Sequence, residues 1–311
     1  MSTTQVTPVS ATGAPPAGGN RRPPRVRRPD ARGRSAATRR SPGAVVVLIA
    51  LAVLAVITLL PVLLAALNAV KSPADYVANG PLALPRSFDL TGITSFWQSV
   101  DFTGKLLNSV LISGSVAVIA VVLSLLTAYA IGIGRIRGSF GVLAVFMVAF
   151  TLPQEALIYP LYVMAKAVGL YDTKLSVIIV LAVLQSAFGT YLLSSVLHTF
   201  PAEVLEAARM DGAGTFRVLW SIVMPLTRPT LVVLATFFFI WTWNEFFIPL
   251  VLLPSNENQT VSVALGALFG QYTSDPVTSA AAALVGVLPA LVFFLVFQRT
   301  LMKGVNIGAV K

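Results

Sequence analysis

Six long apolar runs follow one another along almost the whole chain after residue 42. Each approaches or exceeds the roughly 20 residues that a helix needs to cross a bilayer. The runs cover residues 43–67, 106–133, 140–161, 175–197, 230–253 and 280–297. Since lipid offers no hydrogen-bond partners, backbone groups inside a bilayer must be paired within the protein. The sequence therefore predicts an all-α integral membrane protein with six transmembrane helices.

The composition supports a membrane location and excludes several kinds of chemistry. Hydrophobic residues make up 56% of the chain and charged residues only 11%. A soluble domain carries about 25% charged residues. Because the chain has no cysteine, disulfides, thiolate metal sites and cysteine nucleophiles are excluded.

The first 41 residues are rich in Pro, Gly, Ser, Thr and Arg and have almost nothing apolar to bury, which predicts a disordered tail. Nine arginines lie between residues 21 and 40 and account for most of the net charge of +10. Directly before an apolar run, they favour a cytoplasmic, topology-setting tail with weak attraction to anionic lipid. A nucleic-acid-binding arm and a cleaved signal peptide are the less favoured readings.

Basic residues in the connecting segments predict the orientation. Those expected inside are Arg135, Arg137, Arg209, Arg217, Arg299 and Lys303. They predict that both termini are cytoplasmic, although Lys166 and Lys174 fall on the outer side. The domains expected are a tail at 1–41, a first helix with an extracytoplasmic loop at 42–103, a transmembrane domain at 104–303 and a C-terminal tail at 304–311.

No catalytic motif is visible. The chain lacks the G-x-x-x-x-G-K-[ST] pattern of an ATP-binding loop and the H-E-x-x-H pattern of a zinc protease. Its only histidine, His198, lies where the fourth run ends, which favours a capping or interface role. The aspartates all lie in predicted loops, which argues against an intramembrane protease. We expect no enzyme activity, cofactor or metal site in this chain.

Residues 201–229 form the longest polar-rich interruption in the hydrophobic C-terminal two-thirds of the chain. Pro201 suits the first turn of a helix. Gly212 and Gly214 are expected to end that helix, and Thr215 is expected to cap a second one. This pattern predicts a helix–turn–helix bracket that is too short and too charged to cross a bilayer.

Two readings of this bracket stay open on physical grounds alone. It can be an amphipathic helix lying in the membrane interface, or a docking element for another protein. Small residues that would let another backbone approach are Ala207, Ala208 and Gly212. Charges that could orient a partner are Glu206, Arg209 and Asp211.

The spacing within the bracket resembles the EAA loop of ABC importer permeases. Glu206-Ala207-Ala208 is followed by three residues, Gly212, nine residues and then an Ile-x-Met-Pro run that ends at Pro225. The family has Leu-Pro where this chain has Met224-Pro225. The resemblance implies that the loop forms coupling helices docking on an ATPase subunit. The coupling residues implied are Glu206, Ala207, Ala208, Arg209, Asp211, Gly212 and Pro225.

Further segments are similar to the carbohydrate-importing, maltose-type branch of these permeases. They are AYAIGIGRIRG at 128–138, IYPLY at 158–162, GLYDT at 169–173, WTWNEFFIPL at 241–250 and GVNIGAVK at 304–311. The last departs from the branch at residues 305–307, and the N-terminal tail has no counterpart. The resemblance implies a type I importer transmembrane domain acting as the second membrane subunit, in a bacterial inner membrane.

The resemblance also implies partners. They are a second permease subunit forming a heterodimer, two ATPase subunits that bind ATP and magnesium, and an extracytoplasmic sugar-binding protein. The bilayer is the remaining partner expected, and nucleic acid is not expected. The function implied is translocation of a sugar or oligosaccharide. The alternatives are a permease for glycerol phosphate or a peptide, and a channel.

Two polar clusters fall within predicted spans, where such groups usually face a pathway or a partner helix. Trp241, Trp243, Asn244 and Glu245 are interpreted either as an outer aromatic belt or as a sugar-facing surface. The second cluster, Pro153-Gln154-Glu155 with two nearby tyrosines, is either a proline kink or part of the translocation path. The candidate path residues are Trp241, Trp243, Asn244, Glu245 and Glu155.

Overall fold

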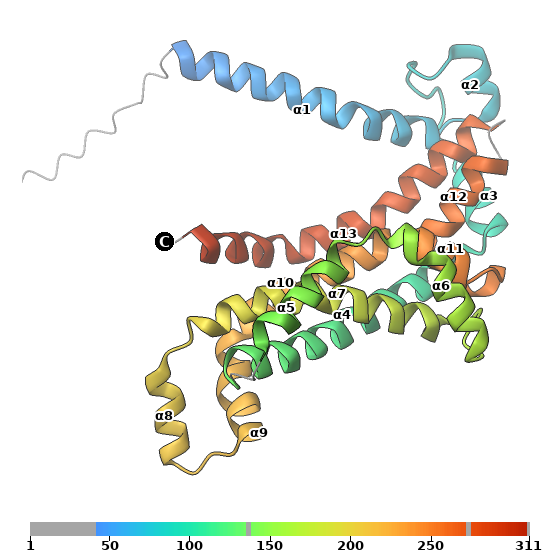
Figure 1. Ribbon diagram of the computed structural model, residues 1–311. Helices are drawn as coiled ribbons and strands as arrows, with labels where there is room; N and C mark the ends of the chain where they lie inside the picture. The colour runs from blue at the N-terminus through green and yellow to red at the C-terminus, as the bar shows by residue number, and fades with distance from the viewer. Residues whose placement is uncertain (1–41, 135–137, 272–274, 310–311) are drawn as a thin grey trace, which may run out of the picture. The chain divides into compact units, whose positions relative to one another are not determined.

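The computed structural model describes residues 42–134, 138–271 and 275–309. Within these ranges the chain consists of helices and turns, with no β-strand (Figure 1). The elements in chain order are α1 (Pro42–Ala69), α2 (Pro73–Asn79), α3 (Thr91–Ser99), α4 (Phe102–Gly132), α5 (Ser139–Thr151), α6 (Gln154–Ala167), α7 (Lys174–His198), α8 (Ala202–Met210), α9 (Thr215–Val218), the π-helical turn η1 (Leu219–Val223), α10 (Met224–Asn244), α11 (Phe247–Leu252), the 3-10 turn η2 (Asn256–Asn258), α12 (Val261–Gln271) and α13 (Pro276–Ala309). The all-α prediction is confirmed. The predicted tail at 1–41 and the basic residues Arg135 and Arg137 lie outside the described residues.

Five helical segments in the described ranges are long and apolar enough to cross a membrane. They are Gly43–Ala69, Phe102–Gly132, Lys174–His198, Thr215–Asn244 and Pro276–Gln298. The third predicted span is a pair of helices, α5 and α6, bent by 97°. Leu152, before Pro153, is extended with ψ 131°, as the clash with a following proline ring requires. Counted as one broken span, the pair gives the six spans predicted.

The chain divides into two units within α1, between Val53 and Leu54. In the first unit, residues 43–53 are helical and their side chains are exposed. The second unit carries the rest of α1 and the remaining described elements.

The fifth predicted span, 230–253, differs from the structure at both ends. The helix begins at Thr215 and runs through η1 to Asn244. Glu245 then turns extended, with ψ 129°, and α11 follows as a separate short helix. Pro249 explains the break, because it has no N–H to donate to the carbonyl of Glu245 in a continuous helix.

Two smaller expectations also differ from the structure. Gly214, not Thr215, occupies the N-cap position of α9, and no side chain caps that end. Thr215 is itself the first helical residue, and the N-cap residue must be non-helical to offer its side chain to the first turn. At the other end of the chain, α13 continues to Ala309, beyond the predicted end of the span at residue 297.

The packing of α4 against α7 forms the centre of the main apolar cluster. Small residues allow the two backbones to approach closely, as is typical of helices in membranes. The Oγ of Ser124 donates to the carbonyl oxygens of Ala120, at 2.6 Å, and of Ser186, at 3.2 Å. Gly189 lies opposite, where an added Cβ would be 2.1 Å from the Ser124 Oγ. Close contact at this point therefore depends on glycine.

The N-terminal end of α4 holds the loop between α11 and α12. Asn108 Nδ2 donates to the carbonyl oxygens of Glu257, at 2.7 Å, and Gln259, at 3.0 Å. The backbone N–H of Val261 donates to Ser109 Oγ at 2.9 Å. Asn108 and Ser109 therefore fix a loop that is distant in sequence.

Asp172, between α6 and α7, also binds the loop between α11 and α12. It accepts hydrogen bonds from the backbone N–H of Ser255, at 3.2 Å, and from the Ser255 hydroxyl. The Ser255 hydroxyl bond is the main reason that the pKa of Asp172 lies below its ordinary value. Because the folded-state pKa is lowered, this contact stabilises the fold at neutral pH, and its contribution is lost as the pH falls through that pKa.

Single cysteines test the topology. Ser95 in α3, Glu257 in η2 and Gly214 before α9 are all exposed. With the α11–α12 loop outside, we expect Ser95→Cys and Glu257→Cys to react with a membrane-impermeant maleimide in intact cells. Gly214→Cys should react only after permeabilisation. Labelling of Gly214→Cys in intact cells, with Ser95→Cys and Glu257→Cys protected, would show that the orientation is the opposite of the one predicted.

Candidate functional site

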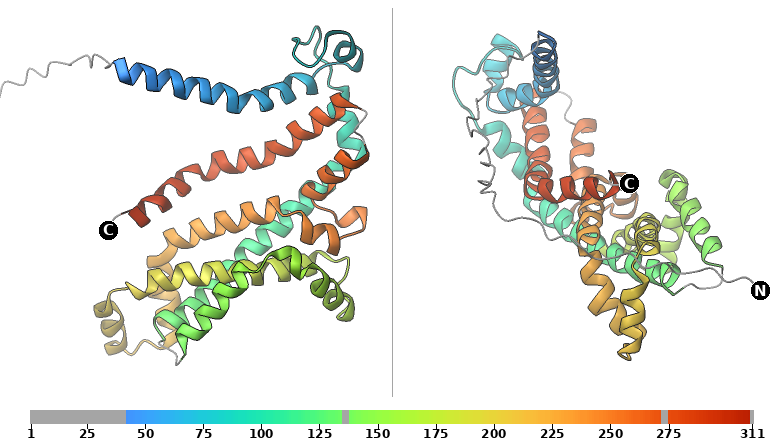
Figure 2. Two further views of the ribbon diagram at one scale, coloured as in Figure 1. Left: turned by 45° about the horizontal axis from the view of Figure 1, so that its top comes forward. Right: turned by 90° about the vertical axis from the view of Figure 1, so that its left-hand side faces the viewer.

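The segment after α7 forms a short helix that lies beyond the ends of α5 and α7 (Figures 1 and 2). This helix, α8, has Pro201 at its N-cap position and ends at Met210. Gly212 follows with φ +72°, the left-handed region that glycine adopts without strain. The N–H groups of Gly212 and Ala213 donate to the carbonyl oxygens of Arg209 and Ala208, at 3.0 and 2.9 Å. These two bonds form a Schellman motif, which confirms the predicted turn at Gly212.

The predicted coupling residues divide between two faces of this segment. The exposed ones are Glu206, Ala207, Arg209, Asp211 and Gly212. Ala208 is only 5% exposed and belongs to the buried cluster that also contains Leu197 and Val218. The expectation that Ala208 offers room for another protein's backbone is therefore wrong, because its small side chain lets α8 pack on its own chain.

Pro225 lies apart from α8, at the second position of α10, and is exposed. It lines a groove between α4 and α10, together with Trp220 and Arg228.

A hydrogen bond from α4 fixes the start of α9, directly after the α8 segment. Tyr129, near the end of α4, donates its hydroxyl to the carbonyl oxygen of Thr215 at 3.1 Å. A polar cavity of about 370 Å³ lies beside this bond, with Arg209 and Gly214 in its wall. A displacement of the segment that contains α8 would therefore be transmitted through this hydrogen bond to α4, a membrane-spanning helix.

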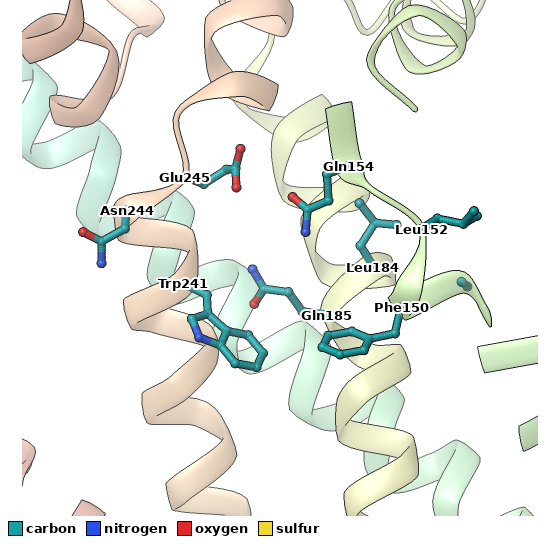
Figure 3. Close-up of a pocket in the computed structure, with 9 residues that line it drawn as sticks. Phe150, Leu152, Gln154, Leu184, Gln185, Trp241, Asn244 and Glu245 are labelled. Atoms are coloured by element: carbon teal, nitrogen blue, oxygen red, sulfur yellow. The ribbon is translucent and has the colours of Figure 1, made fainter. Parts of the chain in front are cut away.

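A second candidate site is a pocket of about 380 Å³ among α5, α6, α7 and α10 (Figure 3). The break between α5 and α6 contributes part of its wall. The lining residues are Ala149, Phe150, Leu152, Gln154, Leu184, Gln185, Trp241, Asn244 and Glu245. Apolar walls with a few polar groups are typical of small-molecule sites.

Three amide side chains and one carboxylate supply the polar groups of this pocket. Gln185 is 6% exposed, and its Nε2 donates to Thr242 Oγ1 at 2.9 Å. Its Oε1 has no hydrogen-bond partner among the described residues. Glu245 is the only ionic side chain that the described part of the chain contributes to the lining. Its Oε1 accepts from the N–H groups of Phe247 and Ile248, at 3.1 and 3.2 Å, which holds the carboxylate at the start of α11.

The structure brings together three of the five predicted path residues: Trp241, Asn244 and Glu245. Trp243 is only 7% exposed and stacks on Phe239, with ring centroids 5.9 Å apart, on the side of α10 that faces α13. Glu155 is exposed in the first turn of α6 and does not line the pocket.

Two lining amides were not among the predicted path residues. Gln154 adjoins Glu155 and lines the pocket in its place, because consecutive residues of a helix do not share a face. Gln185 was missed altogether. Its signal was a single amide within the apolar run of α7, where polar groups are costly and usually functional.

Comparison with known proteins assigns this architecture to a family. Residues 120–306 match the family described as binding-protein-dependent transport system inner membrane component. The chain belongs to this family. It is a permease component of a transport system and a multi-pass membrane protein.

Similar curated proteins are transport permeases. The trehalose transport system permease protein of Mycobacterium tuberculosis is 31% identical over 77% of this chain and 88% of its own length. The melibiose/raffinose/stachyose import permease protein of Bacillus subtilis is 26% identical over 78% of this chain and 88% of its own. The diacetylchitobiose uptake system permease protein of Streptomyces coelicolor is 27% identical over 81% and 84%.

A solved structure has a similar fold over most of this chain. It is the crystal structure of a bacterial ABC transporter involved in the import of the acidic polysaccharide alginate. The matching chain is 24% identical with a TM-score of 0.71, over 83% of this chain and 95% of that chain. This likeness agrees with the predicted type I importer transmembrane domain.

Proposed function

We propose that this chain is one of two membrane subunits of an ATP-driven importer for a sugar or oligosaccharide. The observation that carries the proposal is the exposed α8 segment, with its EAA-type spacing and the left-handed turn at Gly212. The sugar specificity is supported by the named substrates of the trehalose, melibiose and diacetylchitobiose permeases.

In this proposal the exposed charges of α8 contact an ATPase subunit. Glu206, Arg209 and Asp211 orient the docking, and Gly212 sets the geometry of the turn. ATP binding closes the ATPase pair and moves α8, and the Tyr129–Thr215 contact transmits that movement to α4. ATP and magnesium bind the ATPase subunits rather than this chain.

The remaining partners follow from the same assembly. A different permease subunit completes a heterodimer, two ATPase subunits dock on the cytoplasmic side, and an extracytoplasmic binding protein delivers the sugar. Both termini are then cytoplasmic, in a bacterial inner membrane, and α8 lies on the same side.

The pocket beside α10 is proposed as part of the sugar path. The indole face of Trp241 can pack on the C–H face of a pyranose ring, and the amides of Gln154, Gln185 and Asn244 can exchange hydrogen bonds with hydroxyls. Because Trp243 is buried against Phe239, it is not proposed as a sugar contact. Glu155 is not proposed either.

The charge of the pocket bears on the substrate class. No lysine or arginine of the described ranges lines it, and Glu245 contributes a negative charge. Anionic solutes such as glycerol phosphate would meet like charge without a compensating cation, whereas neutral sugars would not. A neutral sugar is therefore the proposed substrate.

Glu245→Gln tests this charge argument. The glutamine Oε1 can still accept from Phe247 and Ile248, so the start of α11 should keep its shape. We expect neutral-sugar uptake to stay within about twofold of wild type. Inhibition by an anionic sugar analogue should become about fivefold stronger or more, because the substitution removes the repulsion between the carboxylate and the analogue. Two like charges 4 Å apart repel by about 1 kcal/mol even in water.

Glu155→Gln is the matched control, because it removes an exposed acidic charge that lies outside the pocket. Competition uptake assays in vesicles would compare the two variants. Equal sensitivity to the anionic analogue in Glu245→Gln, Glu155→Gln and wild type would remove this pocket from the path.

A further inference from the structure

The groove that Pro225 lines, between α4 and the start of α10, has a volume of about 580 Å³. Apolar side chains from residues 117–122 form one wall, and residues 220–235 form the other. Val118 is 64% exposed, Val122 38% and Val232 37%. Both walls belong to helices that are long and apolar enough to cross a membrane, where the surrounding solvent is lipid acyl chains.

Among the described residues, Arg228 is the only cation that lines this groove. It is exposed, and within the described ranges it makes no hydrogen bond or ion pair. It lies 16 residues before Asn244, the last residue of α10, which is about 24 Å at the helical rise, and the hydrocarbon core of a bilayer is about 30 Å thick. The guanidinium can therefore reach the headgroup level of the leaflet next to the α8 loop, because a long basic side chain extends its charged end toward water.

We propose that this groove binds an anionic phospholipid from that leaflet. One acyl chain lies between α4 and α10, and the phosphate accepts hydrogen bonds from Arg228. A guanidinium suits this role because its planar donors match two phosphate oxygens at once. Trp220, at the same end of the groove, has the amphipathic ring that is enriched at the membrane interface.

Charge complementarity favours a lipid over the other candidate occupants. A soluble anion would gain nothing from the apolar walls, and a second protein would have to bring an acidic side chain to pair with Arg228. An anionic phospholipid supplies both the apolar chain and the negative charge. Basic pockets between helices on the cytoplasmic side of membranes recognise lipid headgroups in this way.

Native mass spectrometry of the purified transport complex tests the site. Phosphatidylglycerol or phosphatidylcholine would be added in mild detergent, and the bound lipid counted. We expect the wild-type complex to retain phosphatidylglycerol in preference to phosphatidylcholine. In Arg228→Gln this preference should be about fivefold weaker, which is the usual effect of one basic residue near a membrane surface. Arg228→Lys should keep part of it.

Two further variants separate the headgroup from the chain. Arg217→Gln removes an exposed cation that lies outside the groove and should leave the preference unchanged. Ala235→Phe fills the groove and should reduce retention of both lipids. Wild-type retention in Arg228→Gln would overturn the proposal. Crosslinking of Val118→Cys to the second permease subunit in intact membranes would also overturn it, by assigning the groove to a protein interface.

Discussion

Gly212→Val is expected to reduce sugar-stimulated ATP hydrolysis by the assembled complex at least tenfold, with near-normal amounts of protein in the membrane. Gly212 has φ +72°, where a side chain costs about 1–2 kcal/mol, and a β-branched residue is worse still. An added Cβ would meet nothing within 4 Å of the chain itself, so the change should disturb the turn and its docking face rather than the core. The measurement is the ATPase rate of the reconstituted complex with binding protein and sugar.

Neighbouring substitutions separate backbone geometry from bulk. Gly214→Ala adds a methyl group in the same loop, where φ is −69° and space is open, and should keep wild-type stimulation. Gly212→Asn tolerates the left-handed region and should retain more activity than Gly212→Val. Glu206→Lys, which reverses an exposed charge of α8, should also lose stimulation. Wild-type stimulation in both Gly212→Val and Glu206→Lys would reduce α8 to an interfacial helix.

Gly189→Val is expected to prevent accumulation of the folded protein. A Cβ at this position would lie 2.1 Å from Ser124 Oγ, 2.8 Å from Ser124 Cβ and 2.8 Å from Phe238 Cζ, which is closer than real contacts. Gly189→Ala should already cost about 1–3 kcal/mol of stability through overpacking. Thermal stability of the detergent-solubilised protein, followed by fluorescence-detected size exclusion, would measure the loss.

The loss of stability in Gly189 variants should come from the close α4–α7 contact, not from replacing a glycine within a helix. Gly114→Ala, in α4, adds a Cβ with nothing within 4 Å and should be neutral or slightly stabilising. Ser124→Gly removes the opposing side chain and should recover part of the stability of Gly189→Ala. A Gly189→Ala protein as stable as wild type would show that the two helices are not packed this closely.

Features governed by local chemistry were predictable from the sequence. The spans follow from apolar length, since the bilayer fixes how long a crossing helix must be. The break at Pro153 and the turn at Gly212 follow from the backbone preferences of single residues. The spacing of the loop from Glu206 to Pro225 was sufficient to suggest the family.

The sequence did not predict which side chains of a helix point toward the pocket and which pack against other helices. Trp241 and Trp243 are two residues apart, and residues at this spacing do not share a helix face; one lines the pocket and the other packs on Phe239. Ala207 and Ala208 differ in the same way, as one is exposed and the other buried. Which face points inward is decided by the helices packed around it, and one sequence segment does not contain that information.

Sugar uptake into proteoliposomes tests the central claim most directly. The complex would be purified through a tag on this chain and reconstituted, with ATP and magnesium inside or outside and binding protein on the opposite side. The account predicts accumulation of sugar against its gradient only when ATP faces α8 and the binding protein faces the α11–α12 loop. Equilibration of sugar at the same rate without ATP would identify a channel and contradict the account.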